Sequence, residues 1–436
     1  MAIRIKIKDL RAINKADISL DGITVLSGIN GSGKSTVSRF TYEFLSAALN
    51  YNDLVDRESN LKYMDIGRTL FSASMNLSGI APNAAIQKMN NVLVKFVMGP
   101  ATTSLFNDLR RGLDFMMDAI TKIPKELNKK QEDQLNAFYS TLSTIAGKKE
   151  ANDPLDRLKV ADNIESLMRS VEEESVKTKS SRAIGTFQNF WKSMFVNALN
   201  PERFNVEESG VPMLDTERGI ISLPNSIGNV FYVDSPMALG EIRSYRRYWK
   251  NLNRAIQNEA KLPDGFGYDS DEDLGLLGGS FEWKKEKTEE GLFYTRPDGI
   301  SFNLLDCATG LKSFSIIQML FRDGLIDGKT LMILDEPESH LHPQWIIEYA
   351  RLIVRMHKEI GVRFLIASHN PDMVNAIKSI SEKELGDTFN SHLNFYIAEE
   401  DQGKPYSYSY RSLGTDIAPI FKSFNIALDR IDKYAE

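Results

Sequence analysis

Eight residues near the start of the chain, Gly28 to Ser35, have the spacing of a phosphate-binding loop. They read Gly-Ile-Asn-Gly-Ser-Gly-Lys-Ser and match the pattern G-x-x-x-x-G-K-[ST] in full. Glycine lets such a loop turn its backbone N–H groups towards phosphate oxygens, and the helix that follows adds the positive end of its dipole. Lys34 would reach the β- and γ-phosphates, and Ser35 would hold Mg²⁺. The predicted nucleotide-binding residues are Gly28, Asn30, Gly31, Ser32, Gly33, Lys34, Ser35 and Thr36.

A second group of reactive residues follows an apolar segment late in the chain. Leu331 to Leu334 has the composition of a buried strand, and Asp335 and Glu336 come directly after it. Carboxylates are rarely buried without a partner, so a buried strand that ends in two of them indicates a site. We predict that Asp335 binds Mg²⁺, directly or through water. Glu336 stands one residue on, where it can polarise the water that attacks a phosphate.

Together these two features resemble those of ABC-type P-loop ATPases, in particular the soluble SMC-like and OLD-like branch of AAA family, defence-associated ATPases. The resemblance covers residues 1–50 and about 200–400. It implies ATP and Mg²⁺ as cofactors and ATP hydrolysis as the activity. It also implies that each site is completed by a second copy of the chain, so that two heads associate when ATP binds. The protein is then a homodimer of heads or a higher homo-oligomer.

A segment just before the last α/β part of the chain lies where the resemblance places the family's signature loop. In the family, this loop contacts the γ-phosphate that the opposite subunit holds. It begins at Cys307, directly before the predicted helix that starts near Ser313. Alanine stands where the family usually has serine, and the next residue supplies the nearest hydroxyl. The signature residues that the resemblance implies are Ala308, Thr309, Gly310 and Lys312.

Two further family features follow the carboxylates. The segment 335–343 reads DEPESHLHP, an ending that resembles the OLD-like branch and implies that Ser339, His340 and His342 lie at the interface between two copies. Two histidines near a carboxylate would also suit a metal site. A second apolar segment, Phe364 to Ala367, leads through Ser368 to His369, and the resemblance implies that His369 contacts the γ-phosphate. The predicted catalytic residues are Lys34, Glu336 and His369.

The family's glutamine loop has no direct counterpart in this sequence. Residues 232–236 read Tyr-Val-Asp-Ser-Pro and lie about where that loop belongs, but they contain no glutamine. Asp234 or Ser235 could take its place. Arg11 follows the first predicted strand and could reach the nucleotide, although an arginine there is also typical of a solvated surface.

The elements that must position these residues alternate along the chain. Residues 3–7 and Ile23–Gly28 read as strands, whereas 66–200 is rich in Leu, Met, Ala, Lys and Glu and reads as helical. The last 130 or so residues alternate helix and strand, which indicates parallel strands with crossover helices. We therefore predict an α/β fold with a mainly parallel core sheet, an antiparallel β subdomain and a large helical insertion. The predicted divisions are 1–65, 66–200 and 201–436.

The composition and the cysteine content limit the class of protein and its expected cellular location. The 436 residues carry a formal charge of −6 and are 42% apolar, which is ordinary for a globular protein. No apolar run approaches the roughly 20 residues of a membrane helix, and the N-terminus has no signal-peptide core. The lone cysteine, Cys307, excludes an internal disulfide and the CxxC zinc hook of repair-type relatives. A reducing, cytoplasmic location without a membrane partner is therefore expected.

Two segments could contact DNA. Residues 76–200 hold 17 Lys and Arg against 14 Asp and Glu, and residues 241–261 are basic and aromatic. Arginine and aromatic side chains in the second segment could neutralise phosphates and stack on bases. The same pattern also fits an amphipathic helix that packs its aromatic residues inward.

Three functions remain open at this level. The first is an ATPase that senses DNA or phage components and controls a separately encoded effector, such as a nuclease, in anti-phage defence. The chain has no nuclease motif of its own, so the effector would be a separate protein. The second is a nucleotide-stabilised scaffold that sequesters a toxin. The third is an ABC transporter ATPase subunit, which the large insertion and the missing SALD sequence disfavour.

Overall fold

The chain divides into two compact units, each described here by itself. The computed structural model describes residues 3–98, 105–145, 154–194, 203–239, 246–257, 279–285 and 290–422. The first unit combines Met1–Leu49 with Trp191–Glu436, and the second is Asn50–Phe190. The second unit begins and ends earlier along the chain than the expected helical segment of 66–200. Trp191 is buried among the rings of Phe40, Phe44 and Phe204, which ties it to the first unit.

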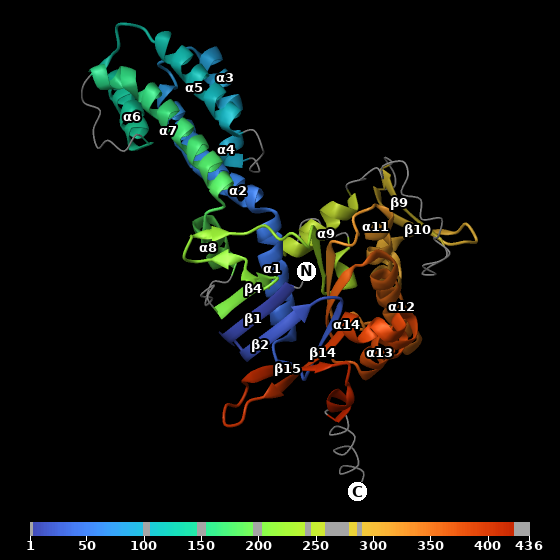
Figure 1. Cartoon of the computed structure of the whole chain (residues 1–436). Coiled ribbons are helices and arrows are strands. Elements are labelled where there is room, and N and C mark those ends of the chain that lie inside the picture. The colour runs from blue at the N-terminus through green and yellow to red at the C-terminus, as the bar shows by residue number, and fades with distance from the viewer. Residues whose placement is uncertain are drawn as a thin grey trace. The chain divides into compact units, whose positions relative to one another are not determined.

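A ten-stranded sheet forms the first unit, in the order β5-β4-β1-β2-β15-β14-β3-β13-β12-β8 (Figure 1). Within the run β14-β3-β13-β12-β8, adjacent strands are parallel to one another. β1 pairs antiparallel with both β2 and β4. The predicted α/β fold with a mainly parallel core is therefore confirmed. The antiparallel strands extend the same sheet, because β15 pairs with β14 on one side and with β2 on the other.

The centre of this sheet is apolar on both faces. All side chains of β3 (Ile23–Ser27) and β12 (Thr330–Asp335) are buried, as expected for parallel strands covered by helices. β13 (Arg363–Ala367) lies between them and joins β3 to β12. The covering helices are α1 (Lys34–Leu49), α11 (Thr309–Arg322), α12 (Pro343–Ile360) and α13 (Pro371–Leu385).

The other strands of the first unit are β1 (Ile3–Leu10), β2 (Ile13–Leu20), β4 (Phe204–Glu208), β5 (Val211–Pro212), β8 (Asn229–Val233), β14 (Leu393–Glu400) and β15 (Tyr408–Gly414). Two smaller sheets pair β6 (Leu214–Asp215) with β7 (Ile220–Ile221), and β9 (Ser280–Lys285) with β10 (Glu290–Thr295) and β11 (Ser301–Asn303). Its remaining helices are η3 (Pro236–Ala238), α9 (Arg247–Gln257), η4 (Leu304–Asp306), η5 (Gly386–Thr388) and α14 (Phe389–His392).

The second unit is helical in its described residues, as the composition predicts. The long helix α2 lies alongside α5, α6 and α7 (Figure 1). Its core holds Leu70, Phe96, Met116, Phe138 and Ile164, all of them buried. The helices are α2 (Tyr51–Ser74), η1 (Met75–Leu77), α3 (Asn83–Leu93), α4 (Lys95–Met98), α5 (Leu105–Thr121), α6 (Lys129–Ile145), α7 (Pro154–Ser181) and α8 (Ile184–Met194), whose last residues enter the first unit.

No helix among the described residues combines the length and the apolar character needed to cross a membrane.

The helix α1 carries an unusual buried carboxylate, which leads to a stability prediction. Glu43 is fully buried, and neither of its oxygens accepts a hydrogen bond from the described residues. Burial raises the pKa of Glu43 to about 7, although Arg247 and Arg39 oppose the shift. Because the folded pKa lies above the unfolded one, stability falls as the pH rises from about 4.5 to 7. Ionisation then costs about 3 kcal/mol at pH 8.

We expect Glu43→Gln to raise the thermal stability at pH 8 and to have little effect near pH 5. Thermal unfolding followed by circular dichroism at both values measures the difference. Glu359→Gln, an exposed change on α12, is the matched control and should be neutral at both. Equal stability of Glu43→Gln and the wild type at pH 8 would contradict this account.

Candidate functional site

The phosphate-binding loop lies between the central strand β3 and the first turn of α1, in the arrangement that the sequence predicts. Gly28, Gly31 and Gly33 have φ values of 151°, 85° and 95°, which favour glycine. A Cβ atom on Gly33 would lie 2.6 Å from Cγ1 of Ile13, so a side chain has no room there.

Asn30 and Gly31 are exposed at the tip of the loop, Ser32 is buried beneath it, and Thr36 is half-buried at the start of α1. The exposed tip presents backbone groups to solvent, where a phosphate chain can approach.

Lys34 bends back over the loop. Its Nζ donates to the carbonyl oxygens of Gly28, at 2.7 Å, and Ile29, at 3.1 Å. Burial lowers the pKa of Lys34, and the nearby Glu336 and Asp335 carboxylates oppose that shift. The ammonium group is therefore held at the mouth of the loop with few water molecules around it, which strengthens its attraction for an anion.

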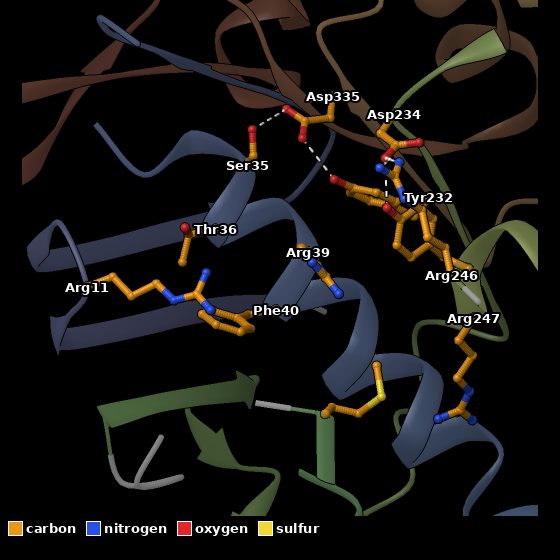
Figure 2. Close-up of a pocket in the computed structure, with 12 residues that line it drawn as sticks. Arg11, Ser35, Thr36, Arg39, Phe40, Tyr232, Asp234, Arg246, Arg247 and Asp335 are labelled. Carbon is orange, nitrogen blue, oxygen red and sulfur yellow. Dashed lines mark hydrogen bonds and ion pairs between the residues drawn. The ribbon is translucent and has the colours of Figure 1, made fainter. Parts of the chain in front are cut away.

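Asp335, at the end of β12, joins the loop to the neighbouring strand. Its Oδ1 accepts from Ser35 Oγ at 3.0 Å, and its Oδ2 accepts from the hydroxyl of Tyr232 at 2.8 Å (Figure 2). Burial raises the pKa of Asp335, and the two hydrogen bonds oppose the rise. Ser35 and Asp335 thus bring a hydroxyl and a carboxylate oxygen together. These are hard oxygen donors of the kind that Mg²⁺ takes from a protein while it keeps waters and phosphates as its other ligands.

The other predicted catalytic residues meet on the adjoining strand end. His369 Nδ1 lies 3.1 Å from Glu336 Oε1, and both side chains are partly exposed. Glu336 has a φ of 51°, a strained conformation for a residue with a side chain, and its N–H donates to Ala367 O at 2.8 Å. This hydrogen bond holds the turn after β12 against the end of β13, which His369 follows. The carboxylate is thereby held beside the imidazole at an open edge of the site.

Glu338 stabilises the turn that carries His369 through hydrogen bonds. It is buried, and its Oε1 accepts from Ser368 Oγ at 2.8 Å and from the backbone N–H of His369 at 3.2 Å. Burial raises the pKa of Glu338, and these hydrogen bonds oppose the rise. No sequence pattern marks Glu338 except its position two residues after Glu336.

Three of the four predicted signature residues line a different cavity, of about 740 Å³. Ala308, Thr309 and Gly310 stand at the start of α11, whose N-cap Ala308 offers no side-chain hydrogen bond. Lys312 is buried and donates to the carbonyl of Leu305 in its own chain. The signature loop therefore presents backbone N–H groups, the alanine and the threonine, while the lysine is engaged within the fold.

The predicted interface residues lie next to this loop. His340 and His342 are exposed and line the same cavity as Gly310, and Trp345 closes one side of it. His342 is also the N-cap of α12, with Nδ1 accepting from the N–H of Gln344 at 3.4 Å. Ser339 is half-buried in the turn directly before His340. In the part of the chain that the structure describes, no three or more His, Cys, Asp or Glu side chains are grouped to hold a metal ion.

Asp234, one of the two residues proposed to substitute for the glutamine, lines the cavity that also borders Ser35 and Asp335. The carboxylate of Asp234 accepts from Tyr248, at 2.8 Å, and from Trp249 Nε1, at 2.6 Å, and pairs with Arg246 at 3.2 Å. Ser235 caps η3 through a hydrogen bond from the N–H of Met237.

Tyr232, which was not predicted to have a role, is the residue of this segment that contacts Asp335. No local pattern marks it, because its partner Asp335 lies 103 residues further along the chain.

A cavity of about 410 Å³ opens beside Ser35, Thr36 and Asp335 (Figure 2). Arg11, for which a role at the nucleotide was only one of two alternatives, lines it and lies with its guanidinium 5.2 Å from the ring centre of Phe40. The arginines that line it are Arg11, Arg39, Arg246 and Arg247. Asp335 and Asp234, which pairs with Arg246, also line the cavity, so the four arginines leave an excess of positive charge that suits a polyphosphate.

The basic aromatic segment packs inward where the structure describes it. In α9, Tyr248, Leu252 and Ile256 are buried, while Lys250 and Arg254 are exposed. The packing interpretation therefore holds for residues 246–257, because the aromatic side chains are not free to stack on bases. Residues 241–245 and 258–261 lie outside the described part of the chain.

Comparison with known proteins gives one family match and several short or distant likenesses. Residues 269–375 match the family model AAA_21, described as "AAA domain, putative AbiEii toxin, Type IV TA system". EcfA2 of Clostridium perfringens, an energy-coupling factor transporter ATP-binding protein, is 43% identical over 44 residues. That alignment covers 10% of this chain and 15% of the relative, and EcfA3 of another strain has the same values.

Several of the solved structures that match this chain are SMC head domains. The SMC head domain of Thermotoga maritima is 12% identical, with a TM-score of 0.34 and coverage of 94% of this chain and 98% of that one. The Smc head of Pyrococcus furiosus, bound to the C-terminal domain of ScpA, is 11% identical, with a TM-score of 0.31 and full coverage of both chains. These values describe a distant likeness.

The loop geometry, the paired strand ends and the family match confirm the predicted class: the chain carries an ABC-type P-loop ATPase domain. Proteins of this class are typically ATP hydrolases.

Proposed function

We propose that this protein binds ATP with Mg²⁺, hydrolyses it, and associates through its heads as part of that cycle. The observation that supports this most is the convergence of Lys34, Ser35, Asp335, Glu336 and His369 at neighbouring strand ends. A phosphate loop alone would suit any nucleotide-binding protein. The added carboxylate beside a histidine supplies the group that hydrolysis needs.

Each residue has a separate task in this proposal. The backbone N–H groups of the loop and the Lys34 ammonium bind the β- and γ-phosphates. Ser35 and Asp335 hold Mg²⁺, which when bound neutralises the charge on the phosphate oxygens. Glu336 orients the attacking water and accepts its proton, and His369 lies against that carboxylate and faces the γ-phosphate.

We propose further that a second copy of the chain completes the site. Gly310 lines one cavity, and Ser35 and Asp335 line another, with no lining residue in common, which supports separate roles for the two loops. In this proposal the signature loop of one chain meets the nucleotide held by another chain. Ser339, His340 and His342 would lie at the same contact.

A mixing experiment tests this arrangement. Lys34→Ala removes the loop lysine, and Gly310→Glu places a negative charge at the signature loop. We expect each variant alone to be nearly inactive, because every site in it lacks one half. Mixed dimers keep one intact site, so an equal mixture should recover about a quarter of the wild-type phosphate release. No recovery above the single variants would contradict completion by a second copy.

The biological role that we propose is control of a separately encoded effector in defence against phage, in the cytoplasm. The AAA_21 description names a putative toxin of a type IV toxin–antitoxin system, which supports a role for this chain in such a system. ATP-driven closure of two heads upon sensing DNA or phage components would change which surface is offered to that effector. DNA binding should weaken steeply with salt if DNA is the trigger.

The same family description also supports a scaffold that sequesters a toxin and uses nucleotide only for its assembly. The Glu336→Gln variant separates the two roles in cells that carry the effector. Full protection by that variant favours the scaffold, whereas loss of protection favours the turnover-dependent sensor. The transporter alternative rests on 44 aligned residues, and co-purification with a membrane subunit would revive it.

A further inference from the structure

The carboxylate of Asp335 uses its two oxygens for different partners. Oδ1 faces Ser35, and Oδ2 accepts the hydroxyl of Tyr232 at 2.8 Å. Tyr232 belongs to β8, which runs parallel to β12 as its neighbour at the edge of the sheet. The tyrosine is 3% exposed, so this hydrogen bond is shielded from water. Its removal would leave a buried carboxylate oxygen without that partner.

Surrounding rings hold Tyr232 in place. The centres of the Tyr232 and Tyr248 rings are 4.7 Å apart, and those of Tyr232 and Tyr42 are 5.7 Å apart. Tyr248 is in turn fixed by its hydrogen bond to Asp234, which also accepts a hydrogen bond from Trp249. Asp234 pairs with Arg246 as well (Figure 2). The Tyr232 hydroxyl therefore has a fixed position relative to Asp335.

We propose that Tyr232 is a positioning residue of the magnesium site, and this inference rests on the proposed function. A free carboxylate can rotate, or can bind a cation through both oxygens. By holding Oδ2, Tyr232 leaves Oδ1 as the oxygen that faces Ser35 and the metal. Partners of this kind, which bind a ligand side chain and not the metal, commonly change metal affinity or activity by about 10- to 100-fold.

The test compares Tyr232→Phe with Tyr42→Phe. The first variant removes only the hydroxyl that binds Asp335. The second removes a hydroxyl from the same aromatic cluster, where Tyr42 accepts a hydrogen bond from Asn251 at 2.9 Å and has no bond to Asp335. A purely structural role in the cluster would affect both variants alike, and their melting temperatures report on that shared effect.

The measurement is the binding of a fluorescent ATP analogue, first in EDTA and then during titration with MgCl₂. We expect Tyr232→Phe to bind the analogue normally in EDTA but to need about 10-fold or more Mg²⁺ for its half-maximal response. Tyr42→Phe should match the wild type in both conditions. ATP hydrolysis by Tyr232→Phe should recover when Mg²⁺ is raised, so that the loss is one of metal affinity.

The outcomes distinguish this inference from the proposed function. If the wild type binds the analogue with Mg²⁺ and Tyr232→Phe has the same Mg²⁺ requirement, Tyr232 is not a positioning residue, and the proposed function is unaffected. An equal Mg²⁺ shift in Tyr42→Phe also overturns the inference. If the wild type binds no ATP analogue in either condition, the proposed function is wrong, and this inference with it.

Discussion

Lys34→Ala should lower ATP hydrolysis by about 10²- to 10³-fold and weaken ATP binding. The ammonium group is buried at the mouth of the loop, where burial lowers its pKa and its charge is poorly shielded by water. Removing it takes away the only side-chain cation that the loop itself contributes. The loss should therefore be much larger than for an exposed lysine. Phosphate release and the affinity for a fluorescent ATP analogue measure the two effects separately.

The matched control is Lys8→Ala, which changes an exposed lysine of β1 in the same unit. Its hydrolysis and its binding should match those of the wild type. Normal turnover by Lys34→Ala, in protein that melts like the control, would remove the basis for assigning the loop as the nucleotide site.

Glu336→Gln should retain ATP and lose turnover by about 10²- to 10⁴-fold. The amide has nearly the same size as the carboxylate and keeps the backbone of the turn, but it cannot accept the proton of the attacking water. ATP should then hold the heads in their associated state. Phosphate release measures the loss, and light scattering after gel filtration with ATP measures the mass of the complex.

Glu348→Gln on α12 is the control, because that glutamate is exposed and forms an ion pair with Arg351 away from the loop. It should hydrolyse ATP normally and show no stable ATP-dependent increase in mass. If Glu336→Gln turns over ATP at the wild-type rate, another residue accepts the proton. If its mass does not change with ATP, heads do not associate in this cycle.

Local patterns were sufficient for the parts of the fold whose physics is local. The spacing of the glycines in the phosphate loop predicts positive φ values just before Lys34, which few other residues adopt. The structure has these φ values at Gly28, Gly31 and Gly33. The apolar runs before Asp335 and His369 form fully or largely buried parallel strands, because each run is long enough for a strand and too short for a helix. The alternation of strands and helices also predicted the α/β class.

The limits of the helical unit were less predictable from composition. The expected division at 66–200 follows the change in residue types, whereas the compact unit spans Asn50–Phe190. Trp191 looks like part of a helical segment in the sequence. Its ring packs against Phe40, Phe44 and Phe204, which are far away along the chain, and that packing decides the unit to which it belongs.

Local sequence patterns were enough to predict the nucleotide loop and the two carboxylates at a strand end, because each depends on residues within a few positions of one another. The α/β class followed from the alternation of strand and helix patterns along the last part of the chain. Which of these side chains meet depends on the tertiary structure. Ser35 and Asp335 are 300 residues apart, and the order β3-β13-β12-β8 brings them and Tyr232 together. Strand order depends on how distant segments pack, so Tyr232 and Glu338 became visible only when the sheet was complete.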